Sequence, residues 1–159
     1  MNIKERIFAD IDAEHQQVLG KWGVQVHDKN WWLIFLFEEF GELAEALAEY
    51  NFRQGPIDDV YDEAIQVATL SIKIYRMAML SSRIWSDTEE FNPCKIMEGL
   101  LIPSKKPLVD ALVELSQYIG NVSRAMASYT AYRCAVSAYD VCYLVLKEMR
   151  KERRNETCV

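Results

Sequence analysis

The sequence has few residues that break helices and few that bind transition metals. It contains six glycines and four prolines in 159 residues, and no segment has the alternating pattern of a convincing β-strand. Because glycine and proline are scarce and lie between periodic segments, the chain is expected to be all-α. Two histidines and four cysteines without a CxxC pair argue against a zinc site of the usual spacing.

Long apolar runs and an excess of positive charge are also missing. The longest purely apolar run, residues 31–37, is seven residues long, which is too short to cross a bilayer. The start of the chain, "MNIKERIFADIDAEH", is charged throughout, unlike a secretory signal. The net charge of −6 argues against general binding to a nucleic-acid backbone. We therefore expect a cytoplasmic protein without a membrane or nucleic-acid partner, with Cys134 and Cys142 as reduced core residues.

The spacing of apolar residues predicts a helical bundle in a single domain, residues 1–159. His15, in the first helix, is expected at the surface. The segment 82–104 is expected to be irregular, with one short helix near 94–100. The five predicted helices cover roughly 3–19, 30–52, 57–80, 105–128 and 130–153.

An internal repeat links the two halves of the chain. "GELAEALAEY" (41–50) aligns without gaps on "GNVSRAMASY" (120–129), and "VYDEAIQVA" can be laid on "AYRCAVSAY". The match predicts a four-helix core from two tandem helical hairpins, one in a motif-bearing half (1–81) and a degenerate copy in 105–154. Alanine-rich helices also align by chance, so a bundle without duplication stays open.

The helix expected over 30–52 carries acids at two kinds of position. On a helical wheel, Glu45 and Glu49 lie opposite the apolar stripe and are expected to be solvated. Glu39 lies at the border of the stripe, and Glu42 and Glu38 follow further round. A carboxylate at the edge of a core needs a partner or must stay protonated.

The next helix is apolar almost all round, as in a buried helix, except for a strip with Glu63, Gln66 and Lys73. Across an antiparallel hairpin, this strip can face the Glu39 and Glu42 border. Converging carboxylates repel one another unless a hard cation such as Mg²⁺ or Mn²⁺ binds between them. A salt-bridged bundle without a metal remains the alternative.

The segments "KWGVQVHDKNWWLIFLFEEFGELAEAL" and "DEAIQVATLSIKIY" resemble the MazG-like nucleotide pyrophosphohydrolases, the all-α NTP pyrophosphatase superfamily. That family carries an EExxE motif on one helix and an ExxD motif about twenty residues later on the next. Glu38, Glu39 and Glu42 match the first motif, and Glu63 matches the start of the second. Gln66 stands where the family has aspartate.

The resemblance covers roughly residues 10–80 and implies hydrolysis of a nucleoside triphosphate to its monophosphate and pyrophosphate. Glu38 and Glu39 would be catalytic, with Glu38 as a ligand or as the base that orients water. The metal, Mg²⁺ or alternatively Mn²⁺, would be bound by Glu39, Glu42, Glu63 and Gln66. Because Gln66 brings no charge, a non-catalytic Mg-nucleotide sensor stays open, as does a purely structural helical protein.

Other residues are candidates for contacts with the nucleotide. Lys73 and Arg76 are candidate phosphate contacts, with ion pairs to nearby acids as the alternative. The candidate base-binding residues are Trp22, Gln25, His27 and Trp32. For Trp32 the alternative role is packing in the core. For His27 the alternative is an exposed polar residue in a loop.

The family resemblance also bears on assembly. Its members commonly form dimers or tetramers, which implies a homodimer here, or an intrachain pseudo-dimer if the repeat is real. In the second copy the candidate carboxylates correspond to Gln117, Tyr118, Asn121 and Cys134, so that copy would hold no metal.

Overall fold

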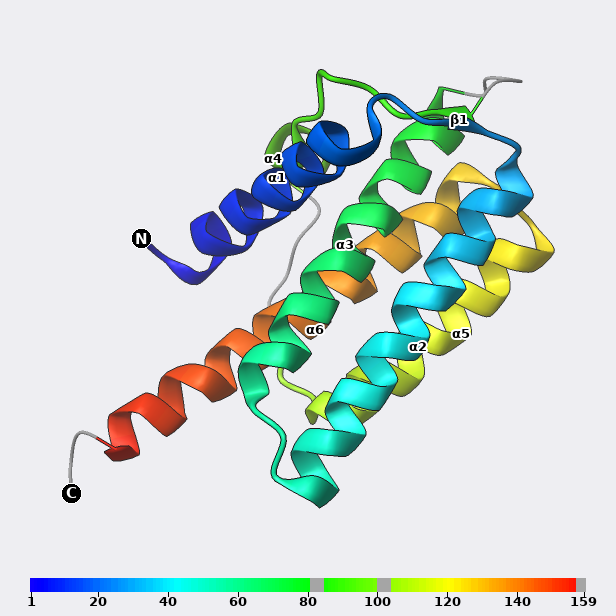
Figure 1. Ribbon diagram of the computed structural model, residues 1–159. Coiled ribbons are helices and arrows are strands. Elements are labelled where there is room, and N and C mark those ends of the chain that lie inside the picture. The colour runs from blue at the N-terminus through cyan, green and yellow to red at the C-terminus, as the bar shows by residue number, and fades with distance from the viewer. Residues whose placement is uncertain (81–84, 100–103, 157–159) are drawn as a thin grey trace.

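The computed structural model describes residues 1–80, 85–99 and 104–156. It confirms the all-α prediction, because the described residues form six helices and only one pair of two-residue strands (Figure 1). The helices are α1 (Ile3–Trp22), α2 (Lys29–Arg53), α3 (Ile57–Met79), α4 (Pro93–Ile96), α5 (Leu108–Arg124) and α6 (Ser128–Glu156). The strands β1 (Val26–His27) and β2 (Trp85–Ser86) pair antiparallel.

Four of these helices form the core. The α2–α3 hairpin packs against the α5–α6 hairpin, with the most extensive packing between α3 and α6 (Figure 1). Helix α3 is therefore buried almost all round, as its apolar composition predicts. This is the predicted four-helix core from two hairpins, whereas the duplication itself stays a prediction.

The predicted bounds of α5 are wrong at both ends, for local reasons. Proline has no N–H and disfavours a helical conformation in the residue before it, so the helix begins only after Pro107. At the other end, the Thr130 hydroxyl donates to the carbonyl oxygens of Ala125 and Ala127. These bonds stabilise a turn where the sequence pattern suggests continued helix.

Cys134 and Cys142 are buried core residues without a disulfide, as predicted. The short helix expected over 94–100 is only the single turn α4. No helix in the described ranges is both long enough and apolar enough to cross a membrane.

His15 is fully buried, and its predicted place at the surface is wrong. It follows Ile7 and Ile11 at four-residue spacing, so it continues the buried stripe of α1. Its ring lies 4.5 Å from the ring of Phe91, measured between centroids. Phe91 thus packs against the buried face of α1 at His15.

The turn between α2 and α3 depends on Gly55. A Cβ atom at this position would lie 2.9 Å from the Cβ atom of Glu49 and 3.1 Å from its carbonyl carbon. The preceding residue, Gln54, has a φ of 60°, which ends α2 in the left-handed conformation. The chain can therefore reverse direction closely enough to bring α3 back along α2.

We expect Gly55→Ala to lower the free energy of unfolding by about 1–3 kcal/mol, because the added methyl group meets helix backbone that cannot move aside. Gly41→Ala is the matched control: it lies inside α2 with open space around its Cβ position. There alanine should stabilise by about 0.5–1 kcal/mol. Urea unfolding of both variants measures the two effects, and equal stability of the variants would contradict the close contact at Gly55.

Candidate metal centre and adjoining cavity

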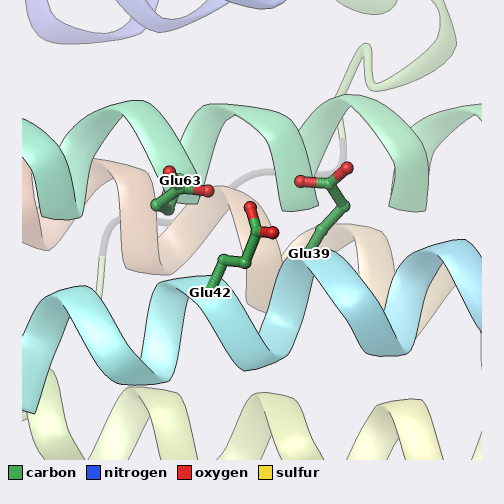
Figure 2. A group of neighbouring side chains, drawn as sticks. All are labelled: Glu39, Glu42 and Glu63. Carbon is green, nitrogen blue, oxygen red and sulfur yellow. The ribbon is translucent and has the colours of Figure 1, made fainter.

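Helices α2 and α3 bring Glu39, Glu42 and Glu63 together. One carboxylate oxygen from each lies within 4.8 Å of the others, and Figure 2 shows Glu39 and Glu42 projecting from α2 toward Glu63 on α3. Within the described ranges, this is the one group of acidic, histidine or cysteine side chains close enough to hold a metal ion. It contains three of the four ligands that the sequence motifs imply.

Among the residues that the structure describes, no cationic side chain is paired with these three carboxylates. Burial, together with the charges of Glu42 and Glu63, raises the pKa of Glu39 to about 7. Burial and Glu42 also raise the pKa of Glu63. The salt-bridged alternative therefore does not describe this cluster.

Glu39 has a free acceptor inside the protein. Its Oε2 atom is buried and has no hydrogen-bond partner among the described residues. A buried polar atom of this kind costs free energy unless something satisfies it. An all-oxygen donor set that includes an unsatisfied carboxylate fits a hard divalent cation such as Mg²⁺.

Gln66 and Glu38 lie beside this cluster. The Gln66 side-chain amide donates to Glu63 Oε2 over 2.9 Å, so it orients that carboxylate. Glu38 is exposed and stands outside the three-carboxylate cluster, but lines the same cavity as Glu39. Gln66 is thus placed to support the cluster through Glu63, and Glu38 to face solvent or a ligand.

A cavity of about 430 Å³ adjoins the carboxylates. Along α3 its wall runs from Gln66 through Leu70 to Lys73, and along the antiparallel α2 from Glu39 through Phe35 to Trp32. The cavity is therefore acidic at one end and largely aromatic at the other. Its lining includes all four candidate base-binding residues, Trp22, Gln25, His27 and Trp32.

The aromatic end has a fixed geometry. The rings of Trp32 and Phe35 lie edge to face with centroids 6.0 Å apart, and His27 lies edge-on to both. The Trp32 indole N–H donates to the Trp85 carbonyl oxygen over 3.1 Å, so it is not free for a ligand. Trp32 is almost fully buried, in keeping with the core-packing alternative, and presents only part of its ring to the cavity.

The two candidate phosphate contacts are placed differently. Lys73 lines the cavity, and its ammonium forms a buried ion pair with Asp87 at 2.8 Å. Arg76 does not line this cavity and lies instead with Ser86 and Thr88 on the far side of Lys73. The ion-pair alternative thus describes Lys73, and Arg76 is outside the space that a ligand of this cavity would occupy.

Five further lining residues were missed at the sequence level, among them Glu14 and Phe35. Glu14 on α1 precedes Val18 and Trp22 at four-residue spacing, which puts all three on one face toward the cavity. Burial raises the pKa of Glu14, whereas the nearby Lys73 charge lowers it. Phe35 lies one turn before Glu39 on the same face of α2. Helical spacing from the recognised residues is the signal that identifies both.

The α5–α6 hairpin has other contacts at the positions that the internal repeat aligns with the candidate carboxylates. The Tyr118 hydroxyl accepts a hydrogen bond from Arg133 and donates to Glu114. Cys134 is buried with its sulfur 3.7 Å from the Ser71 hydroxyl. A cation–tyrosine contact and a core cysteine thus stand where the first hairpin has carboxylates, in keeping with the sequence comparison.

The shifted pKa of Glu39 predicts a pH-dependent stability without added metal. Its folded pKa of about 7 exceeds the ordinary 4.5, so the folded state holds the extra proton between these values. The free energy of unfolding therefore falls as pH rises from about 4.5 to about 7, by about 1–2 kcal/mol after solvent screening. Urea unfolding in EDTA measures this. In Glu39→Gln the free energy of unfolding should fall much less over this pH range. An equally steep fall in that variant would contradict Glu39 as the group that holds the extra proton.

Comparison of the chain with models of known protein families, with curated proteins and with solved structures returns no match.

Proposed function

We propose that the protein hydrolyses a nucleoside or deoxynucleoside triphosphate to the monophosphate and pyrophosphate, with Mg²⁺ bound at the three glutamates. One observation carries this proposal. Three carboxylates from two helices lie within 4.8 Å of one another, and one of them, Glu39, lines the acidic end of an aromatic cavity and has a buried acceptor without a partner among the described residues. Carboxylates for a cation and aromatic rings for a base together suit a nucleotide.

The cation accounts for how an acidic cavity would accept an anionic substrate. Glu39, Glu42 and Glu63 would hold Mg²⁺, or Mn²⁺ in its place, through carboxylate oxygens. The bound ion supplies positive charge for phosphate oxygens that these carboxylates alone would repel. Gln66 keeps Glu63 oriented through its 2.9 Å hydrogen bond.

The remaining groups position the reactants. Glu38 is exposed on the cavity wall beside Glu39, where its carboxylate can accept a proton from water and orient it toward the α-phosphorus. The rings of His27 and Phe35, with that of Trp22 at the entrance, offer surfaces for a base. In this proposal the α-phosphate lies at the acidic end and the base at the aromatic end.

The direct test is pyrophosphate release from a panel of ribo- and deoxyribonucleoside triphosphates. We expect release from at least one nucleotide with Mg²⁺, reduced to background by EDTA and restored by excess Mg²⁺. Release that continues in EDTA would contradict the metal site, and no release from any nucleotide would contradict hydrolysis.

Gln66 favours a second candidate function. At this position an amide hydrogen-bonded to Glu63 replaces a carboxylate, which removes one negative charge from the metal environment. A protein with this change can bind a Mg-nucleotide complex and act as a sensor without turning it over. Calorimetry separates the two functions, because a sensor binds the nucleotide with Mg²⁺ while the nucleotide remains intact.

A further inference from the structure

Lys73 is the one lysine or arginine among the described residues that line the cavity. It lies away from Glu39 on the cavity wall, whereas Glu14 on α1 is near enough for the Lys73 charge to lower its pKa. Lys73 is seven positions beyond Gln66 on α3, about 10 Å along the helix axis at 1.5 Å per residue. Its neighbours on the cavity wall include Leu70 and, from α2, Trp32. The Lys73 side chain therefore borders the aromatic end, where the proposed function puts the base. Its ammonium is bonded to Asp87 and lies 6.0 Å from the centroid of the Phe91 ring.

Asp87 holds this ammonium from outside the cavity. The Asp87 carboxylate does not line the cavity, and its Oδ2 atom accepts from Lys73 Nζ over 2.8 Å with both side chains almost fully buried. Asp87 is itself fixed, since its backbone N–H donates to the Gln25 carbonyl oxygen and its Oδ1 accepts from the Thr88 N–H. An ammonium has three donors, so the bond to Asp87 leaves donors for an acceptor on the cavity side.

His15 is not a second cation that balances the Asp87 carboxylate. Its Nδ1 atom lies 3.9 Å from Asp87 Oδ1, but burial and the Lys73 charge lower its pKa, which keeps the imidazole neutral. Lys73 is thus the cation that balances the buried Asp87 carboxylate. The Lys73 ammonium is held by a partner that is itself fixed.

With the α-phosphate at the glutamates, the edge of the base farthest from the ribose reaches the Lys73 end. The axial separation of Gln66 and Lys73 is comparable with the length of a nucleoside. That far edge carries position 6 of a purine or position 4 of a pyrimidine. In adenine and cytosine the group there is an amine, and in hypoxanthine, guanine, uracil and thymine it is a carbonyl oxygen.

We propose that Lys73, positioned by Asp87, makes the cavity select nucleotides whose base has a carbonyl oxygen at this far edge. The inference rests on the proposed function, because it uses the direction in which the nucleotide lies. An ammonium can only donate, so it pairs with a carbonyl oxygen but leaves an amine facing it unpaired in a buried place. Gln25 and His27 can donate or accept, so they do not impose this choice.

The test compares nucleotides that are matched apart from this edge. We expect kcat/KM for ITP to exceed that for ATP, and UTP to exceed CTP, by about tenfold to a hundredfold, since a site built for a hydrogen bond rejects the analogue that cannot make it. Calorimetry of IMP and AMP supplies a readout without turnover, and IMP should bind more tightly by a similar factor.

The variant to compare is Lys73→Met combined with Asp87→Asn, which removes both buried charges together and leaves neither unpaired. In this double variant the ITP/ATP and IMP/AMP ratios should fall close to one. Equal ratios in the unmodified protein, or ratios that the double variant leaves unchanged, would overturn the role of Lys73. Pyrophosphate release without a preference counts against this inference alone, whereas no release from any nucleotide counts against the proposed function.

Discussion

Glu39→Gln is expected to reduce pyrophosphate release by about a hundredfold or more, because under the proposed function it removes a charge that would hold Mg²⁺ at the reacting phosphate. Without metal the same variant should be more stable than the unmodified protein at pH 8. The reason is that a neutral amide replaces a half-buried carboxylate whose pKa of about 7 reflects burial and repulsion by Glu42 and Glu63. Loss of activity together with a gain of stability distinguishes a metal ligand from a residue that only supports the fold.

The matched control is Glu45→Gln, which changes an exposed glutamate on the same helix. It should leave the rate and the melting temperature unchanged. Added Mg²⁺ should raise the melting temperature of the unmodified protein and of this control, since a ligand that binds only the folded state stabilises it. Glu39→Gln should lose most of that shift. Full activity in Glu39→Gln would exclude the three-glutamate site as the place of reaction.

Asp87→Ala is expected to destabilise the protein by about 3–5 kcal/mol, which is the usual cost of leaving one member of a buried ion pair without its partner. Lys73 would lose the carboxylate at 2.8 Å while its side chain stays about 5% exposed. Thermal and urea unfolding at neutral pH measure the loss.

Two variants give the comparison for Asp87. Glu148→Ala breaks the exposed pair with Lys151 and should cost at most about 1 kcal/mol. The double variant Lys73→Met with Asp87→Asn should recover much of the stability lost in Asp87→Ala, because no uncompensated charge remains. A single Asp87→Ala variant as stable as Glu148→Ala would show that the ammonium finds another partner or solvent.

The candidate site was largely readable from local sequence. Glu39, Glu42 and Glu63 stand at spacings that put the first two on one face of a helix and the third on a facing helix, and the structure brings all three together. Helix positions depend on a period of 3.6 residues, so neighbours three and four apart are predictable from order alone. Gln66 is the exception, because its hydrogen bond to Glu63 depends on the rotamers of both side chains.

The contacts made by residues 85–92 could not be predicted from helical spacing. The β1–β2 pairing, the bond from Trp32 to Trp85 and the cover that Phe91 gives His15 all join this segment to distant parts of the chain. Two-residue strands have no periodicity to detect, and an aspartate in an irregular segment looks like a solvated residue. The sequence pattern therefore gave this segment no role, and it is the segment that fixes the Lys73 end of the cavity.

By itself, the sequence determined the helical class, the approximate helices and the acidic face of α2, because each depends on residues within a few positions of one another. Only the tertiary structure decided that Asp87 binds Lys73 across 14 residues, that His15 is buried, and that Arg76 lies outside the cavity. Such contacts depend on how helices and the connecting segment pack, and packing is set by the whole core at once. The grouping of the three glutamates thus follows from helical spacing, whereas the Lys73–Asp87 pair follows from the packing of the fold.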